Sequence, residues 1–295
     1  MLESVNVNDL DFVYGYMIFK AYFFKVKTKV EGVDYPNSDY AERWRRFCRE
    51  RDFLSLIRRA VELISNEPVT DCLNFYDCLD RSSYFALIHR DHPNITLGFI
   101  KDADLWDLWL NEGIFNFARE KIAELLSISN GDRIIDFGCG SASPVFYGSI
   151  VGPNGYYLGI DFSKPLLNFA SLRVKERRLD WVHLKQELAD SKLRIEGNFD
   201  YAICSSILQY ADYRAVLRNA VNALKGNGTI MIFSEVFSDL EPEKAELFDL
   251  YYSLIPNYRG FPRMSAILEF LEKCCEFRYK LIGRNFLRID VKDVI

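Results

Sequence analysis

Hydrophobic and polar positions change their spacing near residue 133, and this change divides the chain. In residues 12–23, 40–65 and 102–126, apolar side chains recur three and four positions apart, which predicts helices. From residue 133 onward, short apolar runs alternate with segments of helical spacing. The predicted strands are residues 133–137, 156–161, 181–184, 201–205 and 229–234, and the predicted helices between them are residues 144–151, 164–177 and 213–224. This alternation predicts an α/β fold with a parallel, doubly wound sheet.

The last part of the chain departs from the alternation. Helices are predicted near residues 242–254 and 264–274, and two strands follow at residues 277–282 and 286–291. A short connection, Gly283-Arg284-Asn285, joins these two strands. The fold therefore ends with a pair of strands and not with another strand-helix-strand unit.

Residues 1–104 form a mainly helical N-terminal region, and residues 105–295 form the alternating domain with an insert at about 237–264. The aromatic run at 14–26 fits core packing, a dimer contact or a lid over a bound ligand. The arginine-rich segment 40–65 fits a solvated helix face or a surface for phosphate, acidic lipid or RNA. For the region as a whole, a lid or substrate-binding unit, a homodimer contact and a partner surface all stay open.

Composition and charge argue against several classes of protein. The net charge of −5 argues against a dedicated nucleic-acid-binding protein. No run of 18 apolar residues occurs, so no transmembrane segment is expected. The seven cysteines contain no Cys-x-x-Cys pair, and their odd number without a signal peptide predicts a cytoplasmic protein. His89 and His92 lack a third ligand, so no metal site is predicted.

A glycine turn follows the first predicted strand. Asp136 lies near the end of this strand, and Gly138 and Gly140 come directly after it. Glycines allow a close approach of the backbone to a ligand and tolerate a positive φ. Ser141 and Ser143 are predicted to cap the next helix, which has Pro144 in its first turn. A strand, a glycine turn and a helix start together predict a cofactor site.

Two cofactors are compatible with this turn. A dinucleotide site has the pattern Gly-x-Gly-x-x-Gly, but Ser143 stands at the third position, and Asp136 would lie near a pyrophosphate. S-adenosylmethionine has no phosphate, and an acid at residue 136 can balance the positive charge of its methionine end. Asp161 ends the second strand and can accept both ribose hydroxyls, a role that the two cofactor classes share.

At this point the chain resembles the class I S-adenosylmethionine-dependent methyltransferases, in particular their small-molecule branch. The resemblance rests on the turn Ile134-Ile-Asp-Phe-Gly-Cys-Gly-Ser141 and on residues 157–163, 199–212 and 223–232, in this order and at this spacing. It covers roughly residues 105–291. It implies a Rossmann-like sheet of seven strands that closes with an antiparallel hairpin, and it implies S-adenosyl-L-methionine as the cofactor.

The resemblance also implies roles for individual residues. Asp136, Gly138 and Gly140 would surround the methionine moiety, Asp161 would bind the ribose, and Phe162 would pack on the adenine. The full set of implied cofactor-binding residues is Asp136, Phe137, Gly138, Cys139, Gly140, Asp161, Phe162, Gln186, Glu187, Leu188, Ser205 and Ser206. Gln186-Glu187-Leu188 departs from the Asp that the family often has there, and no histidine stands near Gln209-Tyr210, so the general base is unassigned.

Methyl transfer requires alignment of the acceptor, exclusion of water and, for some acceptors, removal of a proton. Tyr210 and Glu235 are the candidate catalytic residues near the strand ends. A small, apolar or aromatic acceptor is expected, and whether oxygen, nitrogen or carbon is methylated stays open. Its pocket is predicted to be walled by Tyr14 or Tyr16 together with Tyr252 or Tyr258.

Three other functions fit parts of the sequence. One is an RNA methyltransferase that uses the arginine-rich helix, although Ser205-Ser-Ile-Leu208 stands where a base-reading motif is expected. Another is a regulatory or dimerising protein that binds the cofactor without turnover. The last is a dinucleotide-dependent reductase.

Overall fold

The computed structural model describes residues 46, 103–111, 113–195, 198–252 and 257–294. The chain divides into two compact units, one of residues 1–114 with 243–258 and one of residues 115–242 with 259–295. The described part of the first unit contains helix α5 (Ala103–Leu110), the first two residues of α6 (Gly113–Leu126) and nearly all of α10 (Pro242–Tyr252). Among the described residues, no helix is both long enough and apolar enough to cross a membrane.

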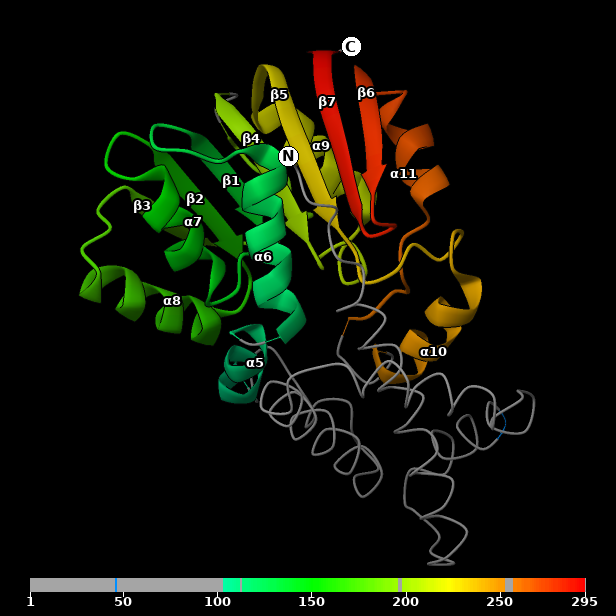
Figure 1. Ribbon diagram of the computed structural model, residues 1–295, viewed down its shortest axis with the longest axis horizontal. Helices are drawn as coiled ribbons and strands as arrows, with labels where there is room; N and C mark the ends of the chain where they lie inside the picture. The colour runs from blue at the N-terminus through cyan, green and yellow to red at the C-terminus, as the bar shows by residue number, and fades with distance from the viewer. Residues whose placement is uncertain (1–45, 47–102, 112, 196–197, 253–256, 295) are drawn as a thin grey trace, which may run out of the picture. The chain divides into compact units, whose positions relative to one another are not determined.

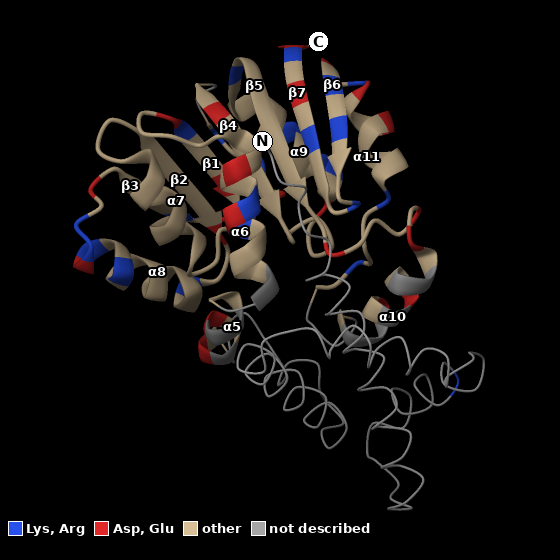
Figure 2. Cartoon of the chain, viewed as in Figure 1, with Lys and Arg blue, Asp and Glu red and all other residues tan. Residues whose placement is uncertain are grey.

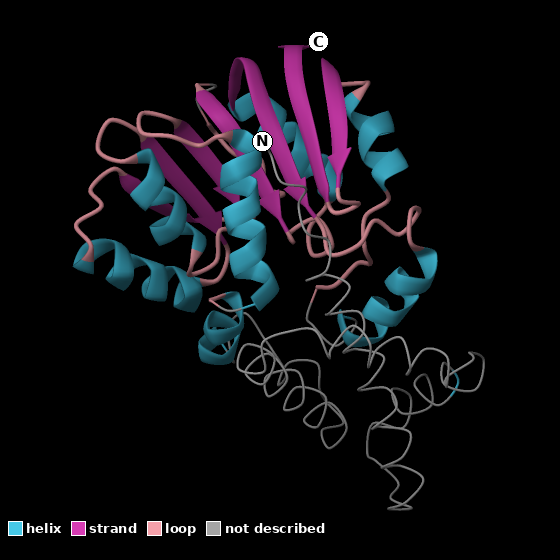
Figure 3. Cartoon of the chain, in the orientation of Figure 1, coloured by secondary structure: helices cyan, strands magenta, loops and turns pink. Residues whose placement is uncertain are grey.

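In its described part, the second unit has one seven-stranded sheet with the order β3-β2-β1-β4-β5-β7-β6 (Figures 1 and 3). The strands are β1 (Arg133–Phe137), β2 (Tyr156–Asp161), β3 (Val182–Gln186), β4 (Phe199–Ser205), β5 (Leu224–Phe233), β6 (Cys275–Ile282) and β7 (Phe286–Val294). Strands β1 to β5 pair in parallel, and β7 runs antiparallel between β5 and β6. The predicted doubly wound sheet with an antiparallel final hairpin is confirmed.

The strand order identifies the edge of the sheet at which a ligand is expected. The chain proceeds outward from β1 to β2 and β3 and then returns to the other side of β1 as β4. The crossover connections therefore leave β1 and β4 in opposite directions. In open α/β sheets, such a reversal opens a crevice outside the carboxyl ends of the two strands, and ligands bind there.

Helices cover both faces of the sheet (Figure 3). Helices α6, α7 (Ser143–Val151) and α8 (Lys164–Glu176) lie on one face, and α9 (Tyr213–Ala223) and α11 (Met264–Leu271) lie on the other. The α6 helix packs on the hairpin, since Phe117 and Phe286 meet edge to face at 6.5 Å and Arg288 donates to the Leu125 carbonyl at 2.9 Å. Basic residues, Arg173 and Lys175, lie in the last turn of α8 (Figure 2), where the helix dipole favours them.

Successive side chains of a strand point to opposite faces of the sheet, so the buried side chains divide between these two faces. Ile135 and Phe137 belong to a cluster of fully buried side chains that includes α9 and α11 residues. Because successive side chains of a strand point to opposite faces, Ile134 and Asp136 point toward the face with α6 and α7. The carboxylate of Asp136 is therefore buried beneath two helices and not at the rim of the sheet.

Four predicted strand starts differ from the structure: β3 begins at Val182 and β6 at Cys275, one and two residues from the predicted starts, and β4 and β5 also begin elsewhere. β4 begins at Phe199 and β5 at Leu224, because these two residues pair with each other before the register shifts between Phe199 and Tyr201. Residues 224–228 thus belong to the strand, with Asn227 at a φ of 65°. The predicted bounds of β1 and β2 are confirmed residue for residue.

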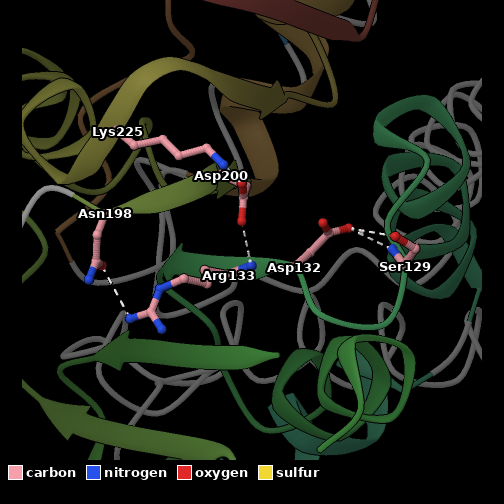
Figure 4. A network of polar contacts seen from close by, with 6 residues as sticks. All are labelled: Ser129, Asp132, Arg133, Asn198, Asp200 and Lys225. Carbon is pink, nitrogen blue, oxygen red and sulfur yellow. Dashed lines mark hydrogen bonds and ion pairs between the residues drawn. The ribbon is translucent and has the colours of Figure 1, made fainter. Parts of the chain in front are cut away.

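Polar contacts tie together the amino ends of the central strands (Figure 4). The Asp200 carboxylate accepts the backbone N–H of Arg133 at 2.8 Å and forms an ion pair with Lys225. Asp132 accepts the backbone N–H of Ser129 at 2.7 Å and so fixes the turn that leads into β1. These contacts fix the register of β1, β4 and β5 at the edge opposite to the crevice.

Candidate functional site

The glycine turn lies at the carboxyl end of β1. Gly138 and Gly140 have φ values of 73° and 57°, which a residue with a Cβ adopts only at a cost. The backbone N–H groups of Gly138 and Cys139 both donate to the carbonyl of Ile160 on β2, at 2.8 and 3.1 Å. A Cβ on Gly138 would lie 2.8 Å from the Ile207 side chain. Both the conformation and the space therefore require glycine at residue 138.

The start of α7 corrects one prediction from the sequence. The predicted caps Ser141 and Ser143 are wrong, because the N-cap residue is Ala142, whose side chain makes no cap hydrogen bond, and Ser143 is already helical. The side chain of Ser141 is fully buried, and its hydroxyl has no hydrogen-bond partner. Such a buried hydroxyl is costly unless a ligand or water satisfies it. The turn thus contains a buried polar group without a hydrogen-bond partner.

Asp161 connects the ends of β1 and β2. One of its carboxylate oxygens accepts the Gly140 N–H at 2.8 Å, and the other accepts the Ser163 N–H at 2.8 Å. Burial raises the pKa of Asp161, and the backbone donors, Ser163 and Gly140 first, oppose this rise. A carboxylate has about four acceptor positions, so these two bonds leave capacity for ribose hydroxyls. The predicted ribose contact stays a prediction, as does the packing of the half-buried Phe162 on adenine.

Asp136 lies at the centre of a buried polar cluster. Its side chain is 1% exposed, and it accepts the Tyr157 hydroxyl at 2.7 Å. Burial raises the pKa of Asp136 to about 7, against the lowering effects of the Tyr157 hydrogen bond and the charge of Arg119. The rings of Tyr147 and Tyr157 stack with centroids 6.2 Å apart, and the Tyr147 hydroxyl has no hydrogen-bond partner. A carboxyl group with a pKa near neutrality will lose its proton more readily when a cation lies nearby.

The sequence analysis missed Arg119, although its spacing contained a signal. Phe115, Arg119, Ile122 and Leu126 form one row along α6 at helical spacing, and all four are buried. An arginine in an otherwise apolar row of a helix indicates a buried charge, and a buried charge requires an anionic partner. Asp136 is such a partner, since its charge raises the pKa of Arg119 against the lowering effect of burial.

The end of β3 lies beside the end of β2. The Glu187 N–H donates to the Asp161 carbonyl at 3.0 Å, and the Gln186 amide donates to the Phe162 carbonyl at 3.4 Å. Leu188 is 57% exposed, an unusual fraction for a large apolar side chain. These contacts place Gln186 and Glu187 next to the predicted ribose residue, and contacts of residues 186–188 with adenine stay predictions.

Ser205 and Ser206 end β4 next to the glycine turn. Ser206 has a φ of 51°, an uncommon conformation for a serine, and such conformations cluster at functional sites. Its N–H donates to the Phe233 carbonyl at 2.9 Å, while its buried hydroxyl has no hydrogen-bond partner. The next residue, Ile207, is the one against which Gly138 packs. Both serines thus lie at the carboxyl end of β4, and their predicted contacts with the cofactor and acceptor stay predictions.

The two candidate catalytic residues follow β4 and β5, and Glu235 lies close enough to Tyr210 to affect its pKa. Glu235 is 1% exposed, and its carboxylate accepts the side-chain amide of the fully buried Gln209 at 3.3 Å. Burial raises the pKa of Tyr210, and the charge of Glu235 raises it further. The Asn285 amide holds the loop by donating to the carbonyls of Ser234 and Glu235, at 3.0 and 2.8 Å.

The predicted acceptor residues lie partly outside the described chain. Tyr14 and Tyr16 are outside the described residues. Tyr252 and Tyr258, in the first unit, have ring centroids 5.9 Å apart, and the Tyr258 hydroxyl donates to the Asp249 carboxylate. Their proposed role as walls of an acceptor pocket stays a prediction.

The sheet order, the glycine turn and the two buried acids define the nucleotide-type site of the class I methyltransferase fold. Comparison with known families agrees, since residues 135–230 match the family described as "Methyltransferase domain". The chain therefore contains a class I S-adenosylmethionine-dependent methyltransferase domain, as the resemblance had implied.

Two curated relatives illustrate the similarity. The uncharacterized protein MJ0906 of Methanocaldococcus jannaschii is 32% identical over 225 residues, which are 75% of this chain and 61% of that protein. The chain thus spans less than two thirds of the length of this relative. A demethylmenaquinone methyltransferase of Listeria welshimeri is 26% identical over 174 residues, which are 52% of this chain and 74% of that enzyme.

Two solved structures share the fold. The CurJ carbon methyltransferase superposes with a TM-score of 0.61 at 10% identity, over 98% of this chain and 91% of that chain. An O-methyltransferase family protein of Burkholderia thailandensis superposes with a TM-score of 0.51 at 15% identity, over 65% of this chain and 60% of that chain. At such low identity these likenesses concern the fold alone.

Proposed function

We propose that this protein transfers the methyl group of S-adenosylmethionine to a small acceptor molecule. The observation that carries the proposal is the pair of buried carboxylates, Asp136 and Asp161, at the ends of adjacent strands on either side of one glycine turn. When it is bound, the cofactor supplies an electrophilic methyl group on a sulfonium. The residues of the chain bind and orient this cofactor, align the acceptor and exclude water.

The residues of the crevice fit this cofactor. The buried hydroxyls of Ser141 and Ser206 lack hydrogen-bond partners, which a polar ligand can provide. Asp136 supplies negative charge for the methionine end, and Asp161 retains acceptor capacity for the ribose. A pyrophosphate beside the buried Asp136 would instead bring like charges together in a site of low dielectric constant. The electrostatics of the turn thus favour S-adenosylmethionine over a dinucleotide.

The acceptor in this proposal is apolar or aromatic and loses a proton during the reaction. The Glu235 carboxylate, held by Gln209 at 3.3 Å, is the proposed proton acceptor at the carboxyl ends of β4 and β5. A base is needed for an acidic O–H or C–H, and a neutral amine does not need one. The relative named demethylmenaquinone methyltransferase supports an aromatic acceptor of this kind.

Four described cysteines are free thiols, which supports a cytoplasmic location.

A transfer assay with S-adenosylmethionine labelled in its methyl group tests this function. The acceptors are a reduced naphthoquinone, a simple phenol and a primary aromatic amine, and the products are identified by mass spectrometry. We expect label in the naphthoquinol or the phenol, and loss of turnover in Asp161→Asn but not in the exposed control Asp180→Asn. Transfer to the amine alone would contradict the acid-base part of the proposal. Binding of the cofactor without transfer to any acceptor would favour a regulatory protein.

A further inference from the structure

The sheet of the second unit ends in a strand whose outer side is open. Among the residues that the structure describes, β6 pairs only with β7, so its other side offers backbone N–H and C=O groups to a further strand (Figure 1). Edge strands are usually short or irregular, which prevents them from pairing with other chains. β6 has eight residues, and the register shift in the hairpin places the extra residue, Lys292, on β7. The outer side of β6 is therefore a long and regular strand edge.

The side chains of β6 alternate between the two faces of the sheet. Phe277 and Leu281 pack against the core on the face with α9 and α11. Tyr279 lies between them on the same face, but it is 54% exposed. Its ring centroid lies 6.4 Å from that of Phe277. The row of side chains that covers the core thus contains an exposed aromatic position at the edge of the sheet.

The other face of β6 carries charges. Glu276, Arg278 and Lys280 are exposed there, and none of them forms an ion pair with another residue in the described part of the chain. Arg278 stands opposite Asp290 on β7, whereas Lys280 stands opposite Arg288. Like charges directly across two strands destabilise a sheet. Lys280 is therefore placed unfavourably within the hairpin, and an acidic neighbour on its outer side would offset this cost.

A second copy of β6 supplies such a neighbour. When a two-fold axis passes through the pair at Arg278, the two strands run antiparallel, and each Glu276 lies opposite Lys280 of the second copy. On the other face, each Phe277 then lies opposite Tyr279 of the second copy. Opposite charges and aromatic pairs directly across two strands are both stabilising. We propose that the protein forms a homodimer in which the β6 strands of two copies pair antiparallel about Arg278.

The charges of β6 also select this register over its neighbours. A shift of the axis to Tyr279 places Arg278 opposite Lys280, and a shift to Lys280 places two lysines opposite each other. With the axis at Arg278 only the two arginines meet as like charges, and each has Asp290 on its other side. Charges that only guard an edge strand against pairing are expected to repel a second copy in every register. The contact is independent of the proposed function, because β5 and β7 separate β6 from β4 and the crevice.

Sedimentation equilibrium of the full chain over a range of concentrations tests this contact. The variants are Glu276→Lys, Lys280→Glu and the double variant that exchanges the two charges. Glu176→Lys and Lys175→Glu, which reverse exposed charges at the end of α8, are the matched controls. We expect the wild type and the controls to be dimers. Each single variant should raise the dissociation constant about tenfold or more, because two pairs of opposite charges become pairs of like charges.

The double variant should return to within about threefold of the wild type, since each lysine again meets a glutamate. A monomeric wild type overturns the inference, and so does a dimer that neither single variant weakens. A double variant as weak as the single variants also overturns it, because the two charges would then not face each other.

Hydrogen exchange of the wild type provides a second test, which decides the matter even if a variant does not fold. Backbone amides within residues 276–280 should exchange about threefold or more slowly at a high protein concentration than at a low one, because pairing protects amides on the outer side of β6. Exchange in this segment that does not depend on concentration overturns the inference.

Discussion

Replacement of Asp136 by asparagine tests the electrostatics of the site through protein stability alone. Burial raises the pKa of Asp136 from 3.8 to about 7. The folded protein therefore binds a proton at this carboxyl group more tightly than the unfolded chain does. Wherever the folded state binds more protons, stability falls as the pH rises. The Asp136 contribution is thus complete below about pH 4, and it is lost as the pH rises to about 7.

The size of this effect follows from the same values. One unit of pKa corresponds to 1.36 kcal/mol, so the change from 3.8 to about 7 amounts to about 4 kcal/mol. Asparagine is neutral at every pH and has nearly the shape of the protonated acid, and its carbonyl can accept the Tyr157 hydroxyl. We expect Asp136→Asn to be about as stable as the wild type at pH 4 and below, and to become more stable than the wild type progressively as the pH rises from 4 to 7. Near pH 8 the variant should be more stable by several kcal/mol.

Urea unfolding followed by circular dichroism at pH 5, 6, 7 and 8 measures this difference. The comparison with the wild type cancels the other titrating groups, and Asp180→Asn is the control for the loss of an exposed carboxylate. The stability that the variant gains should come with loss of cofactor binding, as expected where a functional site is electrostatically strained. A difference between variant and wild type that is the same at pH 5 and pH 8 would refute the reasoning.

Three further predictions concern the turn, the hairpin and the base. Gly138→Ala should lower the free energy of unfolding by about 1–2 kcal/mol from its positive φ alone. Contact of the new Cβ with Ile207 should add to this loss. The control Gly226→Ala should be nearly neutral in the same urea titration, because its Cβ would meet nothing within 4 Å. Asn285→Ala removes the donor of two loop carbonyls and should cost about 1–3 kcal/mol; a thermal melt unchanged from the wild type would contradict this. Glu235→Gln should reduce turnover about 100-fold or more without changing the affinity for S-adenosylhomocysteine, and equal loss of both would show that Glu235 supports the fold instead.

The central strands could be predicted from the sequence because their signals are local. β1 and β2 are short apolar runs, each bounded by polar turns, and both are buried on two faces of a parallel sheet. Their predicted bounds agree with the structure. The start of β5 was not predictable in this way, since its glycines look like a turn and only pairing with Phe199 keeps the segment in the strand.

The site could be predicted only where it consists of consecutive residues. The glycine turn and the acids at 136 and 161 are visible as local motifs. Arg119 and Tyr157 join Asp136 from a helix and a neighbouring strand, so their meeting depends on the packing of α6 and on the register of β1 with β2. The wrong prediction of serine caps for α7 has a similar cause. The helix begins at Ser143 after Ala142, and the Ser141 hydroxyl is buried in the turn, where it caps nothing.

The most direct test of the central claim is a calorimetric titration of the wild-type protein at pH 8 with S-adenosylhomocysteine, and separately with oxidised and reduced nicotinamide dinucleotides. Asp136 is then ionised, so the methionine end meets its full negative charge. We predict saturable binding of S-adenosylhomocysteine to one site per chain and no binding of either dinucleotide. Binding of a dinucleotide without binding of S-adenosylhomocysteine would contradict the account.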